Sequence, residues 1–171
     1  TSQNGETEMM SFHNIFNEWY AAQTSKKIRA VWQMKAASGK RISSTVPYGY
    51  MKSSEDKEKW IIDEEAAEVV RRIFSLSLAG RGIAQIARQL EQEKILIPTA
   101  YKIEKGLSTT HKYPEKPYYW DPATVAGIID NRQYTGCTVN FKTTTVSYKV
   151  HKVIHKSEDE QQIIPNTQDA I

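Results

Sequence analysis

One long helical pattern near the start of the chain restricts its architecture most. Apolar residues recur at helical spacing from Phe12 to Trp19 and again from Ile28 to Trp32. This spacing predicts a single helix over 11–38, which would be roughly 42 Å long at about 1.5 Å per residue. Such a helix is longer than a small domain is wide, so we expect one half of it to project. The polar residues 1–10 are expected to form a flexible lead-in.

The apolar stripe of this predicted helix lapses at residues 23–27, "QTSKK". Two interpretations fit the lapse: a solvated stretch of helix, or a helix that crosses a polyanion. Because a coiled coil needs an unbroken apolar seam, the lapse argues against a continuous coiled coil over this length.

The rest of the chain predicts a mainly helical α+β fold, with a helix-turn-helix-like core and two small β-hairpins. Asp63 is expected to cap the first core helix, and Asp121 with Pro122 forms a strong start for the last. The expected elements are a hairpin over 46–62, helices over 64–79, within 81–94 and over 122–131, an irregular inserted loop over 94–119, a hairpin over 137–151 that turns at Lys-Thr-Thr-Thr, and an acidic linker over 157–171.

Positive charge is concentrated in two segments although the net charge is only +3. From Trp19 to Ser54 the chain has seven Lys or Arg and no acid, and from Asn131 to Ser157 it has five and no acid. Such segregation builds a basic face on a nearly neutral protein. Lys142, in the second segment, is expected to contact DNA from this face.

The segment "GKRISST", residues 39–45, has the composition of a phosphate clamp. Lys and Arg side chains neutralise phosphates and release counterions. Ser hydroxyls donate hydrogen bonds to phosphate oxygens, which fix register without reading sequence. We therefore expect DNA contacts from Lys40, Arg41, Ser43 and Ser44. The stiff aromatic "PYGY" that follows is expected to anchor the segment in the core.

Other kinds of site find little support in the sequence. A single cysteine excludes an internal disulfide and a multi-cysteine zinc site, and it suits a reducing cytosol. No G-x-S-x-G, H-E-x-x-H or P-loop pattern occurs, so we expect no cofactor, no metal and no catalytic residue. No apolar run approaches a membrane span and no signal peptide opens the chain, which predicts a cytoplasmic protein without a membrane partner.

Several stretches occur together in one order: "NEWYAAQTSKKIRAVWQMKAASGK", "VPYGY", "RRIFSLSLAGRGIAQIARQL" and "WDPATVAGIIDNRQYTG". In this order, the sequence over 11–150 resembles the large serine recombinases, the serine integrases and transposon recombinases. The resemblance implies a connecting helix over 11–38 and a recombinase DNA-binding domain over 39–156, with 157–171 leading toward a further domain.

That resemblance also implies a function. The family recognises attachment-site DNA during integration or excision of bacterial and phage mobile elements. Its serine nucleophile lies in an N-terminal catalytic domain, so the parent would be an enzyme whereas this part is expected to be inactive alone. Double-stranded DNA is the implied partner, together with self-association of the full-length recombinase.

The resemblance further implies which residues contact DNA. Thr24, Ser25, Lys26, Lys27 and Arg29 would lie where the connecting helix meets the duplex. The helix over 122–131 would read bases, with contacts from Thr124, Asn131 and Arg132. The stretch that separates this helix from "IAQIARQL" is longer than a helix-turn-helix turn, which excludes a compact motif and leaves the loop 99–119 as an alternative reader.

Two other functions remain open from the residues. A DNA-binding domain of a transcriptional regulator would have the same basic faces without needing a long projecting helix. A helical protein-interaction module would use the 11–38 helix as a coiled-coil partner.

Overall fold

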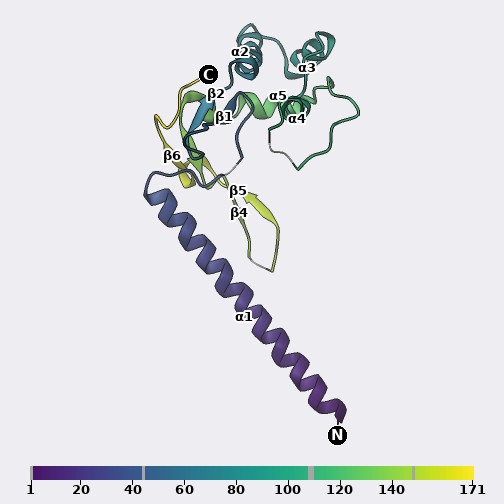
Figure 1. The fold of residues 1–171 in the computed structure, drawn as a ribbon, viewed down its shortest axis with the longest axis vertical. Coiled ribbons are helices and arrows are strands. Elements are labelled where there is room, and N and C mark those ends of the chain that lie inside the picture. Colours follow the sequence, from purple (N-terminus) through teal and green to yellow (C-terminus); the bar gives the residue numbers. More distant parts are fainter. Residues whose placement is uncertain (1, 44, 108–109, 148) are drawn as a thin grey trace. The chain divides into compact units, whose positions relative to one another are not determined.

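The computed structural model describes residues 2–43, 45–107, 110–147 and 149–171 (Figure 1). As predicted, the fold is α+β and mainly helical. The chain forms two compact units. The first contains the residues up to 43 together with 139–164, and the second contains 45–138 together with 165–171.

The first unit contains the long helix α1, which runs from Ser2 to Ala37. It begins nine positions earlier than expected, so the prediction of a flexible lead-in over 1–10 is wrong for the described residues 2–10. The stretch contains no proline and ends in two methionines, which favour helix. The helix ends two residues before Gly39, which has φ +73° and donates its N–H to the Ala36 carbonyl at 2.9 Å.

Short strands complete the first unit. They are β3 (Thr138–Asn140), whose first residue belongs to the second unit, β4 (Thr143–Thr145), β5 (Val153–His155) and β6 (Gln162–Ile164), with the 3-10 turn η2 (Glu158–Glu160) before β6. The strand β3 pairs with β6, and β4 pairs antiparallel with β5, with Thr144 opposite Ile154.

The predicted hairpin over 137–151 is therefore wrong. The three threonines expected in its turn form β4 instead, in keeping with the strand preference of β-branched residues. Phe141, between β3 and β4, has φ +57°, so the chain bends there and the two strands find different partners.

The second unit holds these elements in chain order: β1 (Tyr50–Lys52), β2 (Trp60–Ile62), α2 (Glu64–Leu78), α3 (Ile83–Gln92), α4 (Pro98–Glu104), α5 (Pro122–Ile129) and the 3-10 turn η1 (Arg132–Thr135). The predicted hairpin over 46–62 is confirmed, because β1 and β2 pair antiparallel with Tyr50 opposite Ile62. The prediction of an irregular loop over 94–119 missed α4, which Pro98 starts at the first helical position.

Two helix starts were predicted, with different outcomes. The Asp121 carboxylate accepts a hydrogen bond from the Ala123 N–H at 2.8 Å, as expected of a cap. The Asp63 side chain makes no cap hydrogen bond at the start of α2. Both of its oxygens instead accept from the Tyr101 hydroxyl at 2.9 Å.

The core of the second unit is built from α2, α3 and α5, with an aromatic cluster beside them. Trp120, Ile73, Ile86, Leu90, Val70 and Val125 are its largest fully buried apolar side chains. Tyr48 and Tyr50 are buried, as the "PYGY" segment predicted.

The last residues are part of the fold, so the prediction of a linker over 157–171 is also wrong. Residues 162–164 form β6, and the Ile171 N–H donates to the Tyr134 carbonyl at 3.1 Å within the second unit. The prediction overlooked Ile163, Ile164 and Ile171, which are half-buried in the structure, and Ile171 packs against the core of the second unit.

Candidate nucleic-acid interface

A run of polar and positive side chains lies on α1. Thr24, Lys26, Lys27 and Arg29 are exposed, and Ser25 is half-buried. Within the described part of the chain, no carboxylate pairs with Lys26, Lys27 or Arg29. Their positive charges are thus uncompensated and lie on one rigid element.

The segment after α1 is held by two polar side chains of the first unit, the buried Asn140 and the half-buried Gln162. The Ile42 N–H donates to Asn140 Oδ1 at 3.0 Å, and Asn140 Nδ2 donates to the Lys40 carbonyl at 2.9 Å. Asn140 Nδ2 also lies 3.2 Å from Gln162 Oε1, and Gln162 Nε2 donates to the Ala36 carbonyl at 2.9 Å. These bonds connect the end of α1 and the segment 40–42 to β3 and β6.

This anchoring leaves the polar side chains of the segment near the surface. Lys40 and Ser43 are exposed and Arg41 is half-buried, whereas Ser44 lies outside the described residues. Sequence reasoning missed Asn140 and Gln162. No local pattern marks an asparagine in a short strand as buried, and its partners lie about 100 positions earlier in the chain.

We expect Asn140→Ala to destabilise the first unit by about 1–3 kcal/mol, because the Ile42 N–H and the Lys40 carbonyl lose their partner in a part-buried site. Urea denaturation monitored by circular dichroism measures the change. Asn17→Ala, at an exposed asparagine of α1 in the same unit, is the control. Equal stability of the two variants would show that Asn140 does not anchor the segment.

The paired strands β4 and β5, with the residues beside and between them (142–155), add further positive charge to the first unit. Lys152 is exposed and Lys142 is half-buried. Lys149 pairs with Glu18 of α1 at 2.8 Å, and both side chains are more than half exposed. Exposed ion pairs of this kind are worth at most about 1 kcal/mol, so the pair with Glu18 constrains Lys149 only weakly.

The three residues expected to read bases lie in the second unit. Thr124 on α5 is half-buried, and Arg132 is exposed. The Asn131 side-chain oxygen accepts from the Gln133 N–H at 3.3 Å, where it caps η1. Of the three, Arg132 is the one whose side chain is both long and exposed. The structure thus places 24–29, 40–43 and Lys142 in one unit, and Thr124, Asn131 and Arg132 in the other.

Two searches of the described residues bear on other kinds of site. None of the described helices is both long enough and apolar enough to cross a membrane. Over the same residues, no group of three or more His, Cys, Asp or Glu side chains is arranged to hold a metal ion.

Comparison with known proteins gives one match. The model of the family described as Recombinase matches residues 64–171, from the start of α2 to the last residue. No curated protein and no solved structure matches the chain significantly. The family match includes residues 157–171, in agreement with their packing in the fold. Since it covers well over half of the 171 residues, the chain belongs to the Recombinase family and its role lies in site-specific DNA recombination.

Proposed function

We propose that this chain is the DNA-binding part of a site-specific serine recombinase, and that it recognises attachment-site DNA during integration or excision of a mobile element. The observation that carries the proposal is the set of uncompensated positive charges at Lys26, Lys27 and Arg29, on a member of a recombination family. In the proposal the chain binds and positions the duplex, and the serine nucleophile comes from a catalytic domain.

The geometry of α1 suits the phosphate backbone. Lys26 and Arg29 are three positions apart and so lie close together on the helix surface, with Lys27 beside them. Thr24 and Ser25, one turn earlier, supply hydroxyl donors for phosphate oxygens. Contacts of this kind fix the position of a protein on the duplex without reading its sequence.

The segment 40–43 extends this surface beyond the helix. Asn140 holds its backbone through the Ile42 N–H and the Lys40 carbonyl. Because the backbone is fixed, less conformational entropy is lost when the Lys40 side chain and the Ser43 hydroxyl bind a phosphate. Lys142, beside β4 in the same unit, is the further contact that we propose.

Double alanine substitution tests the proposal. We expect Lys26→Ala with Lys27→Ala to weaken binding to a random-sequence 40-bp duplex by about tenfold for each lost phosphate contact at about 0.1 M salt. The matched control is Lys57→Ala with Lys59→Ala, two exposed lysines among acidic residues in the β1–β2 connection. Fluorescence anisotropy gives the dissociation constants. Equal losses in both variants, or no duplex binding by the natural chain, would contradict the proposal.

Self-association of the full-length recombinase is the second part of the proposal. It is supported by apolar side chains on α1 that are exposed to solvent, among them Phe12 at 66%, Ile15 at 69% and Trp19 at 57%. Exposed apolar side chains that gather on one helix mark a protein contact. Sedimentation of the full-length protein should show a dimer that Trp19→Ser weakens, and identical behaviour of the two proteins would exclude this stripe.

A further inference from the structure

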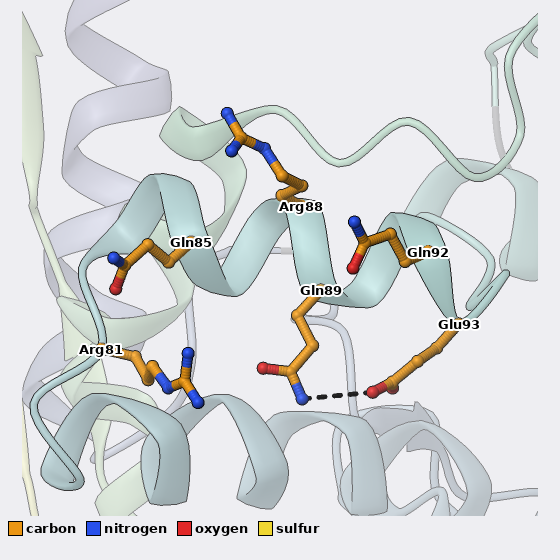
Figure 2. Close-up of a pocket in the computed structure, with 6 residues that line it drawn as sticks. All are labelled: Arg81, Gln85, Arg88, Gln89, Gln92 and Glu93. Atoms are coloured by element: carbon orange, nitrogen blue, oxygen red, sulfur yellow. Dashed lines mark hydrogen bonds between the residues drawn. The ribbon is translucent and has the colours of Figure 1, made fainter.

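A polar surface on α3 lies outside the DNA contacts proposed above. Figure 2 shows the pocket of about 450 Å³ that it lines. The lining side chains are arginines, glutamines and one glutamate: Arg81, Gln85, Arg88, Gln89, Gln92 and Glu93. Apart from Arg81, just before the helix, and Glu93, just after it, they come from α3 itself.

The fold fixes which side of α3 faces outward. Ile86, Ala87 and Leu90, on the opposite side, are at most 2% exposed. The start of the helix is also capped, because the Gly82 N–H donates to Gln85 Oε1 at 3.1 Å. The buried apolar side and the capped start of α3 together fix the orientation of its polar face.

The carboxylate of the pocket is compensated within the second unit. Glu93 forms an ion pair with Arg72 of α2. It also accepts from Gln89 Nε2 at 3.2 Å, the hydrogen bond drawn in Figure 2. The negative charge of Glu93 is therefore neutralised by Arg72, and the hydrogen bond to Glu93 fixes the Gln89 side chain.

The remaining donors of the pocket are available. Among the described residues, neither the Arg81 nor the Arg88 guanidinium makes a hydrogen bond or ion pair, and the same holds for the Gln92 amide. Arg88 and Gln92 are one helical turn apart, and in Figure 2 they extend on the same side of α3. The helix thus presents a guanidinium and a carboxamide next to each other.

This pair has the chemistry of base recognition. Arg forms two hydrogen bonds with guanine O6 and N7, and Gln forms two with adenine N6 and N7. The helix has ten residues and is about 15 Å long, and a major groove about 12 Å wide admits an α-helix.

The exposed surface of α5 and its cap is different. Its exposed residues are Asp121, Pro122, Ala123, Gly127 and Asp130. None of these described side chains is positively charged, and the two carboxylates would face phosphates of the same sign. Outside the pocket α3 also exposes one carboxylate, Glu91, but the α3 surface presents two guanidinium groups, Arg81 and Arg88, and the exposed residues of α5 present none. The α3 surface is therefore better suited to a DNA groove than the α5 surface is.

We infer that the exposed face of α3 is the base-reading surface of this chain, with Arg88 and Gln92 contacting base edges in the major groove and Arg81 contacting the flanking backbone. The inference rests on the proposed function, namely that the chain binds duplex DNA. It assigns sequence specificity to α3, and it leaves Arg132 the role of a phosphate contact.

Selection from a pool of randomised duplexes tests the inference. The natural chain should enrich a sequence motif, and Arg88→Ala and Gln92→Ala should each lose preference at one or two neighbouring positions of that motif. On the enriched duplex each variant should bind about 5- to 150-fold more weakly, the equivalent of about 1–3 kcal/mol for a bidentate base contact.

The matched control is Arg71→Ala, at an exposed arginine of α2 that is paired with Glu64 at 2.9 Å. It removes the same charge and should keep the motif unchanged. If Arg88→Ala and Gln92→Ala enrich the same motif as the natural chain, or if the natural chain enriches none, the inference is overturned although duplex binding persists. If the natural chain binds no duplex at all, the proposed function fails as well, so the two failures are distinguishable.

Discussion

The free energy of unfolding will fall steeply as the pH rises above about 10, because the second unit buries three tyrosines that resist ionisation. Tyr48, Tyr101 and Tyr134 are only 4–6% exposed. Burial raises the pKa of each hydroxyl above its usual value, and for Tyr101 the hydrogen bond to the Asp63 carboxylate raises the pKa further. The Tyr134 hydroxyl also donates to the Tyr48 carbonyl at 2.7 Å.

The direction of the effect follows from where the protons are bound. Below the unfolded-state pKa of about 10, all three hydroxyls are protonated in both states and the stability is complete. Above it, the unfolded chain releases protons that the folded chain retains, so each tyrosine lowers the free energy of unfolding by about 1.4 kcal/mol per pH unit. Three tyrosines together give a loss of about 4 kcal/mol per pH unit until their folded-state pKa values are reached.

Urea denaturation between about pH 9 and about pH 11 measures this slope. Tyr134→Phe should reduce the slope by about one third, because one titrating group is removed. Tyr20→Phe, at an exposed position on α1, is the control and should leave the slope unchanged. A free energy of unfolding that stays constant up to about pH 11 would contradict the burial of these hydroxyls.

Truncation of Trp120 should remove a large part of the stability of the second unit. The side chain is 1% exposed, and its Nε1 donates to the Ile95 carbonyl at 2.9 Å. Its ring meets the Tyr48 ring edge-on at a centroid distance of 6.2 Å. Because the cavity left by an indole does not close fully, Trp120→Ala should cost about 3–5 kcal/mol.

That loss is substantial against the total stability of about 5–15 kcal/mol expected for a folded protein. The neighbouring Tyr119 is 52% exposed, so Tyr119→Ala is a matched aromatic control and should change stability by about 0.5 kcal/mol or less. Urea denaturation of both variants compares them directly. Similar losses would place Trp120 outside the core.

The elements that could be predicted from sequence are those whose signals are local. Helical periodicity located α2, α3 and α5, and the Asp121-Pro122 pair marked the start of α5. The predictions failed where distant residues decide the structure. Asp63 did not cap α2 because Tyr101, 38 positions later, binds its carboxylate. The strand β3 pairs with β6, more than 20 positions away, and no local pattern records such pairing.

The candidate site likewise has a part that local sequence signals predicted and a part that depends on long-range contacts. Segregated charge is visible in the sequence, so the basic segments 24–29 and 40–43 could be named in advance. The role of Asn140 in holding the second segment could not, because it depends on contacts across the first unit. The polar face of α3 was not predicted as a site, because Arg and Gln on an amphipathic helix usually mark a solvated face. Only the three-dimensional contacts distinguish the compensated Glu93 from the uncompensated Arg88.

The most direct test of DNA binding by this chain is the affinity for a random-sequence duplex as a function of salt concentration. Each phosphate contact should contribute a slope of about −0.9 to log affinity against log salt, so about five contacts would give a slope of roughly −4.5. Lys26→Ala should make that slope shallower by about one unit, whereas Lys57→Ala should not change it. An affinity that does not depend on salt would contradict binding through the phosphate backbone.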